Sequence, residues 1–390
     1  MIKKNKGGKS MATVNFSVTK LQEFCEEAFN KFGFTKDEAK KITDVLLLAD
    51  LYNIKSHGTQ RLVRYHKAIE NGSIKIDAKP EIVFETPVSA VIDGHSGMGQ
   101  LISVFATELA IKKAMESGMA FVTVRNSNHF GIAGYYTKMA CDQGLMAIAT
   151  TNSESIAVHT NSRQALLGSN PIAFAMPAEP IPFWFDAATT VVPKGKLEVY
   201  NKEDKSLESG WTLDENGNIC TDAQHALNCI DDKLGGGILT LGGAGETNGG
   251  HKGYGYSMMC ELLCSITSCG KTSNHHVRAK GVGAGTCHSF IVIDPKIFGD
   301  ANEIKNNLSA FLEELRQAKR AEENVPIYTH GEKEYNSFIE RTEKGIDVNI
   351  STVAEMIGIC DYLNMDKSKY IPQNIDLSSA KKSSYDKIYK

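Results

Sequence analysis

The chain has 390 residues, of which 42% are hydrophobic and 23% charged, which is typical of a globular protein with two or three domains. Its 43 Lys and Arg residues nearly balance 46 Asp and Glu residues, and a net charge of −3 argues against a nucleic-acid or anionic membrane partner. No apolar run approaches the roughly 18 residues of a membrane helix, and no apolar segment follows the basic first ten residues. We therefore expect a cytoplasmic protein without a secretory signal.

Nine cysteines, an odd number without the spacing of a disulfide framework, are typical of reduced cytosolic thiols. One region is rich in potential metal ligands, namely Cys260, Cys264, Cys269, His275, His276, Cys287 and His288. It contains no CxxC pair and its other spacings are irregular, so we interpret its cysteines as buried structural residues. The sequence therefore predicts no metal site.

The first predicted elements are helices. Apolar residues recur at helical spacing from Leu21 to Phe32, and the capping box Thr35-Lys36-Asp37-Glu38 opens a second helix that runs to about Leu51. These helices lead to Ser56-His57-Gly58, where Gly58 indicates a break. We expect residues 15–81 to form a helical N-terminal region that packs with the C-terminal part. Residues 1–14 are expected to be disordered or to derive from the expression vector.

From about residue 82, short apolar runs alternate with helical patterns, which predicts a central α/β region over residues 82–300. The predicted strands are 89–93, 119–124, 145–150, 171–176, 183–185 and 289–293, and the predicted helices are 100–115, 132–141 and 254–267. Residues 201–218 are interpreted as a polar surface excursion, and residues 235–255 as a glycine-rich loop.

A helical C-terminal region is expected over residues 301–365. It contains a charged amphipathic helix at 304–319 and a capping box, Thr352 to Glu355, that starts a last helix ending near Leu363. The polar residues 366–390 are predicted to be a surface tail.

The glycine motifs of common nucleotide-binding proteins are missing. The spacing is reversed in Gly94-x-x-Gly97-x-Gly99, no convincing helix follows Gly281-x-Gly283-x-Gly285, and there is no GxxxxGK[ST] loop. Any dinucleotide site must therefore be built without a Rossmann fingerprint.

The first cluster of potentially reactive side chains is Ser56-His57-Gly58 with Arg61 and Tyr65. If a helix follows Gly58, His57, Arg61 and Tyr65 lie at four-residue steps on one face. Arg can bind a carboxylate through two parallel hydrogen bonds and His titrates near neutral pH, so the group suits a 2-keto or 2-hydroxy acid. The alternative is a helix start capped by Ser56, with a solvated basic face.

Two further clusters follow predicted strands. Arg125-Asn126-Ser127-Asn128-His129-Phe130-Gly131 stands where functional polar residues gather in α/β sheets, although it could equally be a turn with a satisfied His. The third cluster combines residues 186–190 and 194–196 with residues 249–255, where small residues, hydroxyls and Lys252 could hold phosphate oxygens. Its alternative is a set of glycine-rich loops with no ligand.

Taken together, these motifs resemble the non-Rossmann malate/L-lactate dehydrogenase family, which also contains ureidoglycolate, sulfolactate and diketogulonate oxidoreductases. The match runs from about Leu21 to Leu363. The motifs that carry it, in chain order, are Leu48-Ala49-Asp50, Ser56-His57-Gly58, Arg61-Leu62, Gly97-Met98-Gly99-Gln100, Arg125 to Gly131, Gly134-Tyr135-Tyr136, Thr151-Asn152-Ser153, Gly168-Ser169-Asn170-Pro171, Asp186-Ala187-Ala188-Thr189, Gly195-Lys196 and His251-Lys252-Gly253-Tyr254-Gly255. The chain departs from the family's pattern at His159 and His330, where proline is common, and at Ser169, where threonine is commoner.

The resemblance implies an α/β fold of the non-Rossmann malate/L-lactate dehydrogenase type, with a helical N-terminal region and a central mixed sheet. It implies that His57 and His129 carry the acid/base chemistry, and that Ser56, Arg61 and Tyr65 bind the substrate. The implied cofactor contacts are Thr151, Asn152, Ser153, Asp186, Ala187, Ala188, Thr189, Thr190, Val191, Val192, His251, Lys252, Gly331 and Glu332.

The expected activity is NAD-dependent interconversion of a 2-hydroxy acid and a 2-keto acid, with malate and oxaloacetate as the first choice and NADP as the alternative cofactor. Lactate, ureidoglycolate, sulfolactate and diketogulonate are alternative substrates within the family. The resemblance also implies a homodimer with the site near the subunit interface. A metal-dependent hydrolase and a non-catalytic binding protein are the alternatives from other classes.

Overall fold

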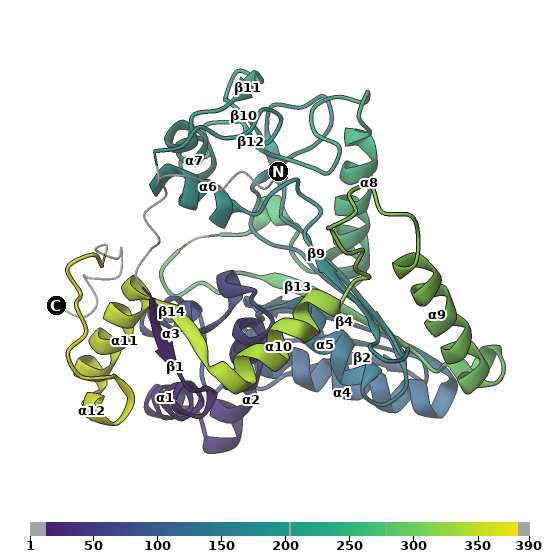
Figure 1. Cartoon of the computed structure of the whole chain (residues 1–390), viewed down its shortest axis with the longest axis horizontal. Helices are drawn as coiled ribbons and strands as arrows, with labels where there is room; N and C mark the ends of the chain where they lie inside the picture. Colours follow the sequence, from purple (N-terminus) through teal and green to yellow (C-terminus); the bar gives the residue numbers. More distant parts are fainter. Residues whose placement is uncertain (1–12, 203, 278, 381–390) are drawn as a thin grey trace. The chain divides into compact units, whose positions relative to one another are not determined.

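The computed structural model describes residues 13–380 except residues 203 and 278 (Figure 1). The chain forms two compact units. The first combines the residues up to Glu70 with those from Glu334 onward, and the second is Asn71–Lys333. The sequence suggested boundaries near residues 81 and 300. Of residues 1–14, expected to be disordered or vector-derived, only Thr13 and Val14 are described, and they begin a strand. Of the predicted tail, residues 381–390 lie outside the described part of the chain.

The unit formed by the two ends of the chain is mainly helical. Helix α1 packs against α2, α11 and α12, and strand β1 pairs antiparallel with β14. The elements of this unit are β1 (Thr13–Phe16), α1 (Val18–Lys31), α2 (Lys36–Leu51), two 3-10 turns (Lys55–His57 and Thr59–Arg61), α3 (Leu62–Glu70), α10 (Glu332–Lys344, which begins at the end of the other unit), β14 (Ile346–Asn349), α11 (Ile350–Leu363) and α12 (Lys367–Tyr370).

Two helices, α2 and α11, were predicted to begin with a capping box. The capping box at the start of α2 is confirmed, because the Thr35 side chain accepts from the Glu38 main chain and the Glu38 carboxylate accepts from the Thr35 main chain. The second predicted capping box is wrong. Helix α11 begins directly after β14 with Asn349 as its cap, so Thr352 lies buried inside the first turn.

The middle of the chain builds a mixed sheet, as the resemblance implied, and this sheet has seven strands. Its order is β2 (Glu81–Thr86), β3 (Ser89–Asp93), β4 (Met119–Ser127), β13 (Thr286–Ile293), β5 (Met146–Thr151), β8 (Ile172–Met176) and β9 (Phe183–Ala187). Only β3 and β4 run parallel, and every other neighbouring pair is antiparallel. Strand β13 therefore arrives late in the chain and inserts between β4 and β5.

Helices cover this sheet. Helices α4 (Gly99–Ser117) and α5 (Ala133–Cys141) pack on it through β4, β5, β8 and β13. Figure 1 shows the two helices below the labelled strands β4 and β13. Phe290 and Val292 of β13 belong to the apolar core shared with α4 and α5. Helix α8 (Gly250–Glu261) continues into a π-helical turn (Leu262–Ile266), and that turn packs against β4, β5 and β13. Helix α9 (Ala301–Arg316) and the 3-10 turns Ser273–His275 and Pro295–Phe298 complete the larger elements around the sheet.

A second, five-stranded sheet lies within the same unit. Its order is β11 (Ile219–Cys220), β10 (Thr212–Leu213), β12 (Gly237–Leu239), β6 (Ala157–Val158) and β7 (Ala165–Leu167), and it is accompanied by α6 (Lys194–Lys202) and α7 (Ala223–Asp231). Buried apolar residues of α6 and α7, including Leu197 and Leu227, pack around Ile238 of β12.

This sheet corrects two predictions. Residues 201–218 are not only a surface excursion, because Thr212 and Leu213 are buried and paired. The predicted loop at 235–255 contains β12 at the centre of the sheet and the first turn of α8. Among the described residues, no helix has the length and apolar character needed to cross a membrane.

Candidate functional site

Ser56 and His57 lie in a short 3-10 turn at the end of the loop after α2. Ser56 Oγ and His57 Nδ1 are 2.8 Å apart, so the hydroxyl and the ring share a hydrogen bond. Ser56 does not cap a helix, since no side chain caps either 3-10 turn. After Gly58 a second 3-10 turn comes first, and α3 begins only at Leu62.

The break at Gly58 is explained by Asp50, at the end of α2. A Cβ on residue 58 would lie 1.9 Å from Asp50 Oδ1, so only glycine leaves room for the carboxylate. Asp50 Oδ2 accepts from the main-chain N–H of Thr59 at 2.7 Å and from its hydroxyl at 2.5 Å. Burial raises the pKa of Asp50 to about 6, although these hydrogen bonds and the charge of Arg341 oppose that shift. Asp50 thus fixes the turn that presents His57.

The ring of His57 is held in its neutral form. Loss of hydration lowers its pKa to about 3, and the positive charges of Arg61 and Arg64 act in the same direction. The direction of the hydrogen bond to Ser56 depends on the tautomer of the ring: in the tautomer with its proton on Nδ1, that nitrogen donates to the hydroxyl and Nε2 is free of a proton.

Arg61 and Tyr65 were also expected at this site. Arg61 Nε donates to the main-chain oxygen of Ser56 at 2.5 Å, so the guanidinium braces the turn that carries His57. Tyr65 is buried in α3 with 1% of its surface exposed.

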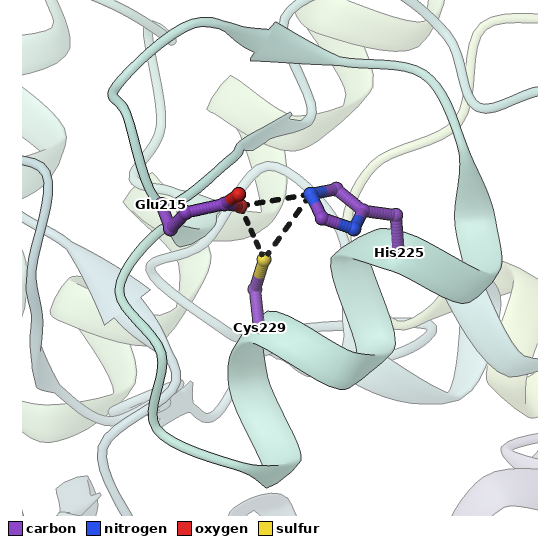
Figure 2. A group of neighbouring side chains, drawn as sticks. All are labelled: Glu215, His225 and Cys229. Atoms are coloured by element: carbon purple, nitrogen blue, oxygen red, sulfur yellow. Dashed lines mark hydrogen bonds and ion pairs between the residues drawn. The ribbon is translucent and has the colours of Figure 1, made fainter.

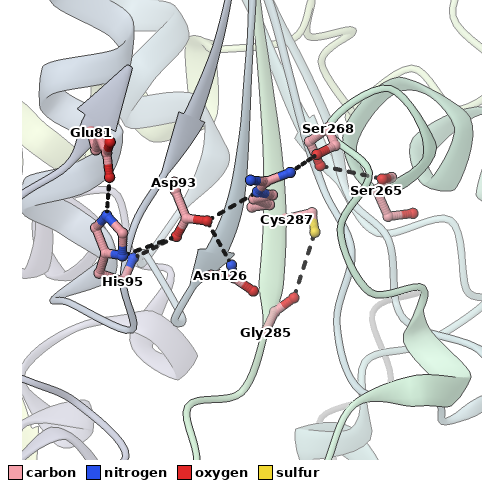
Figure 3. Close-up of polar contacts among 9 residues, drawn as sticks. Glu81, Asp93, His95, Asn126, Ser265, Ser268, Gly285 and Cys287 are labelled. Atoms are coloured by element: carbon pink, nitrogen blue, oxygen red, sulfur yellow. Dashed lines mark hydrogen bonds and ion pairs between the residues drawn. The ribbon is translucent and has the colours of Figure 1, made fainter. Parts of the chain in front are cut away.

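The second cluster begins at the end of β4, in the larger unit, and Asp93 anchors it (Figure 3). Asp93 Oδ2 accepts from Arg125 Nε at 3.0 Å and from Asn126 Nδ2 at 2.9 Å, and Asp93 Oδ1 accepts from the main chain of His95 at 3.0 Å. Burial opposes these hydrogen bonds, but together they keep the pKa of Asp93 below its ordinary value. His95 Nε2 in turn lies 2.8 Å from Glu81 Oε2. Arg125 is therefore a structural residue of this turn.

Asn128 ties neighbouring loops together. Its amide nitrogen donates to the main-chain oxygens of Ser96 and Gly97, each at 2.9 Å, and its amide oxygen accepts from Ala284 at 3.3 Å. A Cβ on Gly99 would lie 2.3 Å from the main-chain oxygen of Asn128. The motif around residues 97–100 thus serves as a close-packed support for residues 128 and 129.

His129 follows directly and is only partly buried. The main-chain N–H of Gly131 donates to His129 Nδ1 at 3.4 Å, and a neutral ring that accepts at Nδ1 carries its proton on Nε2. His129 is therefore arranged as a hydrogen-bond donor.

His288 also belongs to this cluster, which was not predicted from the sequence. Its fully buried ring lies parallel to that of Phe130, with ring centres 4.4 Å apart. His288 Nδ1 is 2.8 Å from Thr151 Oγ1, and Nε2 is 2.9 Å from Ser127 Oγ. Burial lowers the pKa of His288 to about 3, so this histidine is a neutral cross-link between β4, β13 and β5. The alternation of strand β13, with His288 on the same face as Phe290, was the available signal.

The predicted cofactor residues Thr151 and Asn152 make internal contacts. The Thr151 hydroxyl donates to the main-chain oxygens of Asn152 and Cys287, both at 2.9 Å. Asn152 donates to the main-chain oxygen of Lys271 at 2.8 Å and accepts from the Cys287 N–H at 2.9 Å. Both side chains are buried. Ser153 is more accessible, and its hydroxyl accepts from the main chain of Ser169 at 3.0 Å.

A second residue that sequence reasoning missed is Glu261, a buried carboxylate in α8. It accepts from Asn152 at 3.3 Å, from Asn170 at 3.1 Å and from the Ser265 hydroxyl at 2.8 Å. It also accepts from the main-chain N–H and the hydroxyl of Ser273. Glu261 thereby links the loop after β5, which holds Asn152 and Ser153, to the loop that holds Asn170. Its position between Cys260 and apolar residues was the signal in the sequence.

The predicted residues 186–192 run from the end of β9 toward the small sheet. Asp186 Oδ2 accepts from the Gly134 N–H at 2.7 Å and so caps α5, and a Cβ on Gly134 would overlap the Trp184 ring at 1.9 Å. The Thr189 N–H donates to the main-chain oxygen of Ser169 at 3.0 Å. Ala187, Ala188 and Val191 are partly exposed, while Thr189, Thr190 and Val192 are buried.

His251 and Lys252 are placed where an external anion could reach them. Both side chains are exposed in the first turn of α8. The main chain before them is tightly folded, because Gly249 has a φ of +83° and a Cβ on Gly250 would lie 2.2 Å from the main-chain oxygen of Gly243.

The last predicted cofactor contacts form a turn beside β9. The His330 main-chain oxygen accepts from the Trp184 N–H at 3.2 Å, and Gly331 has a φ of +101°. Glu332 is buried, accepts from the Thr329 N–H at 3.1 Å and pairs with Arg316. Its carboxylate therefore stabilises the turn.

The predicted residues are thus brought together in two groups. Ser56, His57, Arg61 and Tyr65 belong to the unit built from the chain ends, and His129 with the predicted cofactor residues belongs to the middle unit. All nine cysteines are free thiols. The interpretation as buried structural residues is confirmed for Cys260, Cys264 and Cys287, and is wrong for the exposed Cys269.

Comparisons with known proteins place this arrangement in context. Residues 16–357 match the family model described as malate/L-lactate dehydrogenase. The chain is 39% identical to malate dehydrogenase of Pyrococcus horikoshii, covering 87% of this chain and 94% of that protein. It is 34% identical to L-sulfolactate dehydrogenase of Methanocaldococcus jannaschii, covering 88% and 96%. Among solved structures, malate dehydrogenase from Entamoeba histolytica superposes with a TM-score of 0.88 at 34% identity, covering 91% and 99% of the two chains.

Proposed function

Because this chain belongs to the malate/L-lactate dehydrogenase family, we propose that it interconverts malate and oxaloacetate with a nicotinamide cofactor. The observation that carries the choice of malate is the near full-length similarity to malate dehydrogenases at 37–39% identity. The family makes the chain a dehydrogenase acting on hydroxy acids, and the substrate and the cofactor form are our proposals.

His57 is proposed as the proton acceptor for the substrate hydroxyl. Three observations support this role: the neutral ring, the hydrogen bond between Nδ1 and Ser56, and the bracing of the turn by Arg61 and Asp50. A low pKa alone makes a weak base, but the carboxylates of an anionic substrate beside the ring would raise the pKa toward neutrality. Arg61 and Ser56 are proposed to orient that substrate, and the burial of Tyr65 gives it a supporting role.

His129 is proposed as a hydrogen-bond donor to the substrate oxygen. The Gly131 N–H donates to Nδ1, and a neutral ring in this arrangement has its proton on Nε2, which can stabilise negative charge that develops on an oxygen. This assignment ranks the two histidines, with His57 as the proton acceptor and His129 as the polarising group.

The chemistry of the residues at α8 fits a nicotinamide dinucleotide. Exposed Lys252 and His251 stand at a helix start whose glycines let the main chain fold closely, which suits the pyrophosphate. Ser153 and the partly exposed main chain at Ala187, Ala188 and Val191 are proposed as further contacts. Thr151, Asn152, Asp186 and Glu332 are proposed to act indirectly, by holding the loops that make the contacts. When bound, the cofactor supplies the two-electron redox chemistry.

The sulfonate analogue of malate is the second candidate substrate. The 34% identity to an L-sulfolactate dehydrogenase favours it over the other family substrates. Both substrates carry two acidic groups around a hydroxyl-bearing carbon, so the same proton acceptor and guanidinium serve either one.

The decisive experiment is an initial-rate assay of NADH and NADPH oxidation with oxaloacetate, sulfopyruvate and pyruvate. We expect the highest kcat/KM with oxaloacetate, and higher activity with NADH than with NADPH. A higher kcat/KM with sulfopyruvate would replace malate by sulfolactate, and no oxidation with any 2-keto acid would overturn the proposed function.

A homodimer and a cytoplasmic location are also proposed. A run of exposed apolar side chains in α8 and its π-helical turn supports the dimer: Tyr256, Met259, Leu262 and Ile266 are 49%, 50%, 48% and 54% exposed. Light scattering coupled to size-exclusion chromatography should give twice the chain mass, and a monomer at micromolar concentration would contradict the proposal.

A further inference from the structure

A separate group of metal-ligating side chains lies beside the small five-stranded sheet. Glu215 stands in the turn between β10 and β11, and His225 and Cys229 stand one turn apart on α7. Figure 2 shows all three side chains pointing toward one another. Among the described residues, they form the one group of His, Cys, Asp and Glu whose ligand atoms all lie within 4.8 Å of each other. None belongs to the motifs discussed above.

The distances approach those of a tetrahedral zinc site. His225 Nε2 lies 2.8 Å from Glu215 Oε2, Cys229 Sγ lies 3.3 Å from the same oxygen, and Sγ and Nε2 are 3.7 Å apart. With Zn–N and Zn–O bonds of about 2.1 Å and a Zn–S bond of about 2.3 Å, ligand atoms in a tetrahedron lie roughly 3.4–3.6 Å apart. Two pairs already match within a few tenths of an ångström. In the third pair, His225 Nε2 and Glu215 Oε2 are at hydrogen-bond distance and would have to move apart from 2.8 Å to about 3.4 Å when the ion binds.

The arrangement differs from a nucleophilic Cys–His–acid relay. In such a relay the acid and the thiol contact different nitrogens of the ring. Here His225 Nε2 faces both Glu215 and Cys229, so three ligand atoms converge on one point.

Local structure holds the three ligands in place. Asp222 caps α7 by accepting from the His225 N–H at 2.8 Å, which fixes the start of the helix. Asp214 accepts from the N–H groups of Asn216 and Asn218 at 2.9 and 2.8 Å, which fixes the turn that carries Glu215. Ligands that are positioned before the ion arrives lose little conformational freedom on binding.

We propose that Glu215, His225 and Cys229 bind one zinc ion that connects the β10–β11 turn to α7. One thiolate, one imidazole and one carboxylate are a ligand set that suits zinc better than magnesium or calcium. The side chains of His225 and Glu215 are 42% and 37% exposed, which leaves room for water as a fourth ligand and for entry of the ion. Binding replaces the S–H bond of Cys229 by a Zn–S bond and releases that proton to solvent.

The proposed ion is structural. It joins a turn to a helix whose residues Ala226, Leu227 and Ile230 pack in the apolar cluster of the small sheet. Zinc should therefore stabilise this part of the chain against unfolding without being required for turnover. The inference does not depend on the proposed dehydrogenase activity.

The test is a cobalt titration of the full-length protein after treatment with a chelator. Co²⁺ should give a thiolate charge-transfer band that saturates at one ion per chain, and Zn²⁺ should abolish the band. The band should be absent in Cys229→Ser and unchanged in Cys269→Ser, a control for the exposed thiol. No thiolate band, or a band that persists in Cys229→Ser or disappears in Cys269→Ser, would overturn the site.

If Cys229→Ser does not fold, cobalt affinity can be measured in two variants that keep the thiol. In Glu215→Gln and His225→Gln the thiol remains, and we expect the cobalt affinity of each to fall at least tenfold. Zinc should also raise the Tm of the wild-type protein and not that of these two variants. Unchanged cobalt affinity, or an equal zinc-induced rise in Tm in all three proteins, would exclude these residues as ligands.

Discussion

The carboxylate of Asp50 occupies the space that any side chain at Gly58 would need, with a hypothetical Cβ only 1.9 Å from Oδ1. Gly58→Ala should therefore displace Asp50 from Thr59 and lower the free energy of unfolding by about 1–3 kcal/mol. Urea denaturation measures this loss. In an Asp50→Ala background the same substitution should cost almost nothing, since the overlap is gone. Equal losses in both backgrounds would show that the overlap does not set the cost.

The two candidate histidines should differ in how they affect turnover. His57→Ala should reduce kcat by about 10²–10⁴-fold, because it removes the proposed proton acceptor, and should leave the Kd for NADH nearly unchanged. His129→Gln retains a donor and should lose less activity than His129→Ala. The exposed His275→Ala serves as a control. Near-normal kcat in His57→Ala would transfer the role of proton acceptor to another residue.

The buried His288 should make stability depend on pH. Its folded-state pKa of about 3 lies below the ordinary value of 6.5, so the unfolded chain binds more protons between these two values. The contribution of His288 is thus fully present above pH 6.5 and is lost as pH falls, with a slope of up to about 1.4 kcal/mol per pH unit. Urea denaturation from pH 5 to 8 should show a weaker dependence in His288→Asn. If the free energy of unfolding of the two proteins changed equally with pH, His288 would not be a source of the pH dependence.

Glu261 should be among the most sensitive positions in the middle unit. Removing its carboxylate in Glu261→Ala leaves buried donors of Asn152, Asn170 and Ser273 without their acceptor, which should cost about 3–5 kcal/mol. Glu261→Gln keeps one acceptor oxygen and should cost less. The measurement is urea denaturation of both variants. A loss below about 1 kcal/mol for Glu261→Ala would mean that water replaces the carboxylate readily.

Lys252 should affect cofactor binding and not stability. Lys252→Gln should raise the Kd for NADH about tenfold or more, because a hydrogen bond to a charged group contributes about 1.5–3 kcal/mol. Its Tm should match that of the wild-type protein, since the side chain is exposed. Lys112→Gln, an exposed lysine of α4, is the matched control. Equal Kd values for the two variants would remove Lys252 from the cofactor site.

Local patterns predicted the larger elements well. The strand expected at 89–93 has those bounds, and the helices at 100–115 and 132–141 differ from α4 and α5 by at most two residues at each end. The small sheet could not be predicted this way, because strands such as β6, β10 and β11 have two residues each and show no alternation. Their pairing, for example Ile238 with Ala157, joins residues far apart in the sequence.

In the candidate site, too, local motifs could be predicted and contacts between distant residues could not. The motifs at His57 and His129 were found from the sequence and its family resemblance, but the supports of those motifs were not. His288 contacts Ser127 and Thr151, which are 161 and 137 residues away. Glu215 and Cys229 lie 14 residues apart and meet only because a turn folds back on α7. The four-residue step from His225 to Cys229 was visible in the sequence, whereas the carboxylate that completes the group was not.

The position of β13 has a consequence for how this protein folds. Strands β4 and β5 are complete by residue 151, yet β13 lies between them and begins only at Thr286. During synthesis, the edges of β4 and β5 that pair with β13 therefore remain without their hydrogen-bond partners until more than a hundred further residues have been made. Such non-local pairing slows folding and leaves strand edges open to wrong partners. The central sheet is in effect completed after translation of most of the chain, and its last-arriving strand also brings His288 into the site.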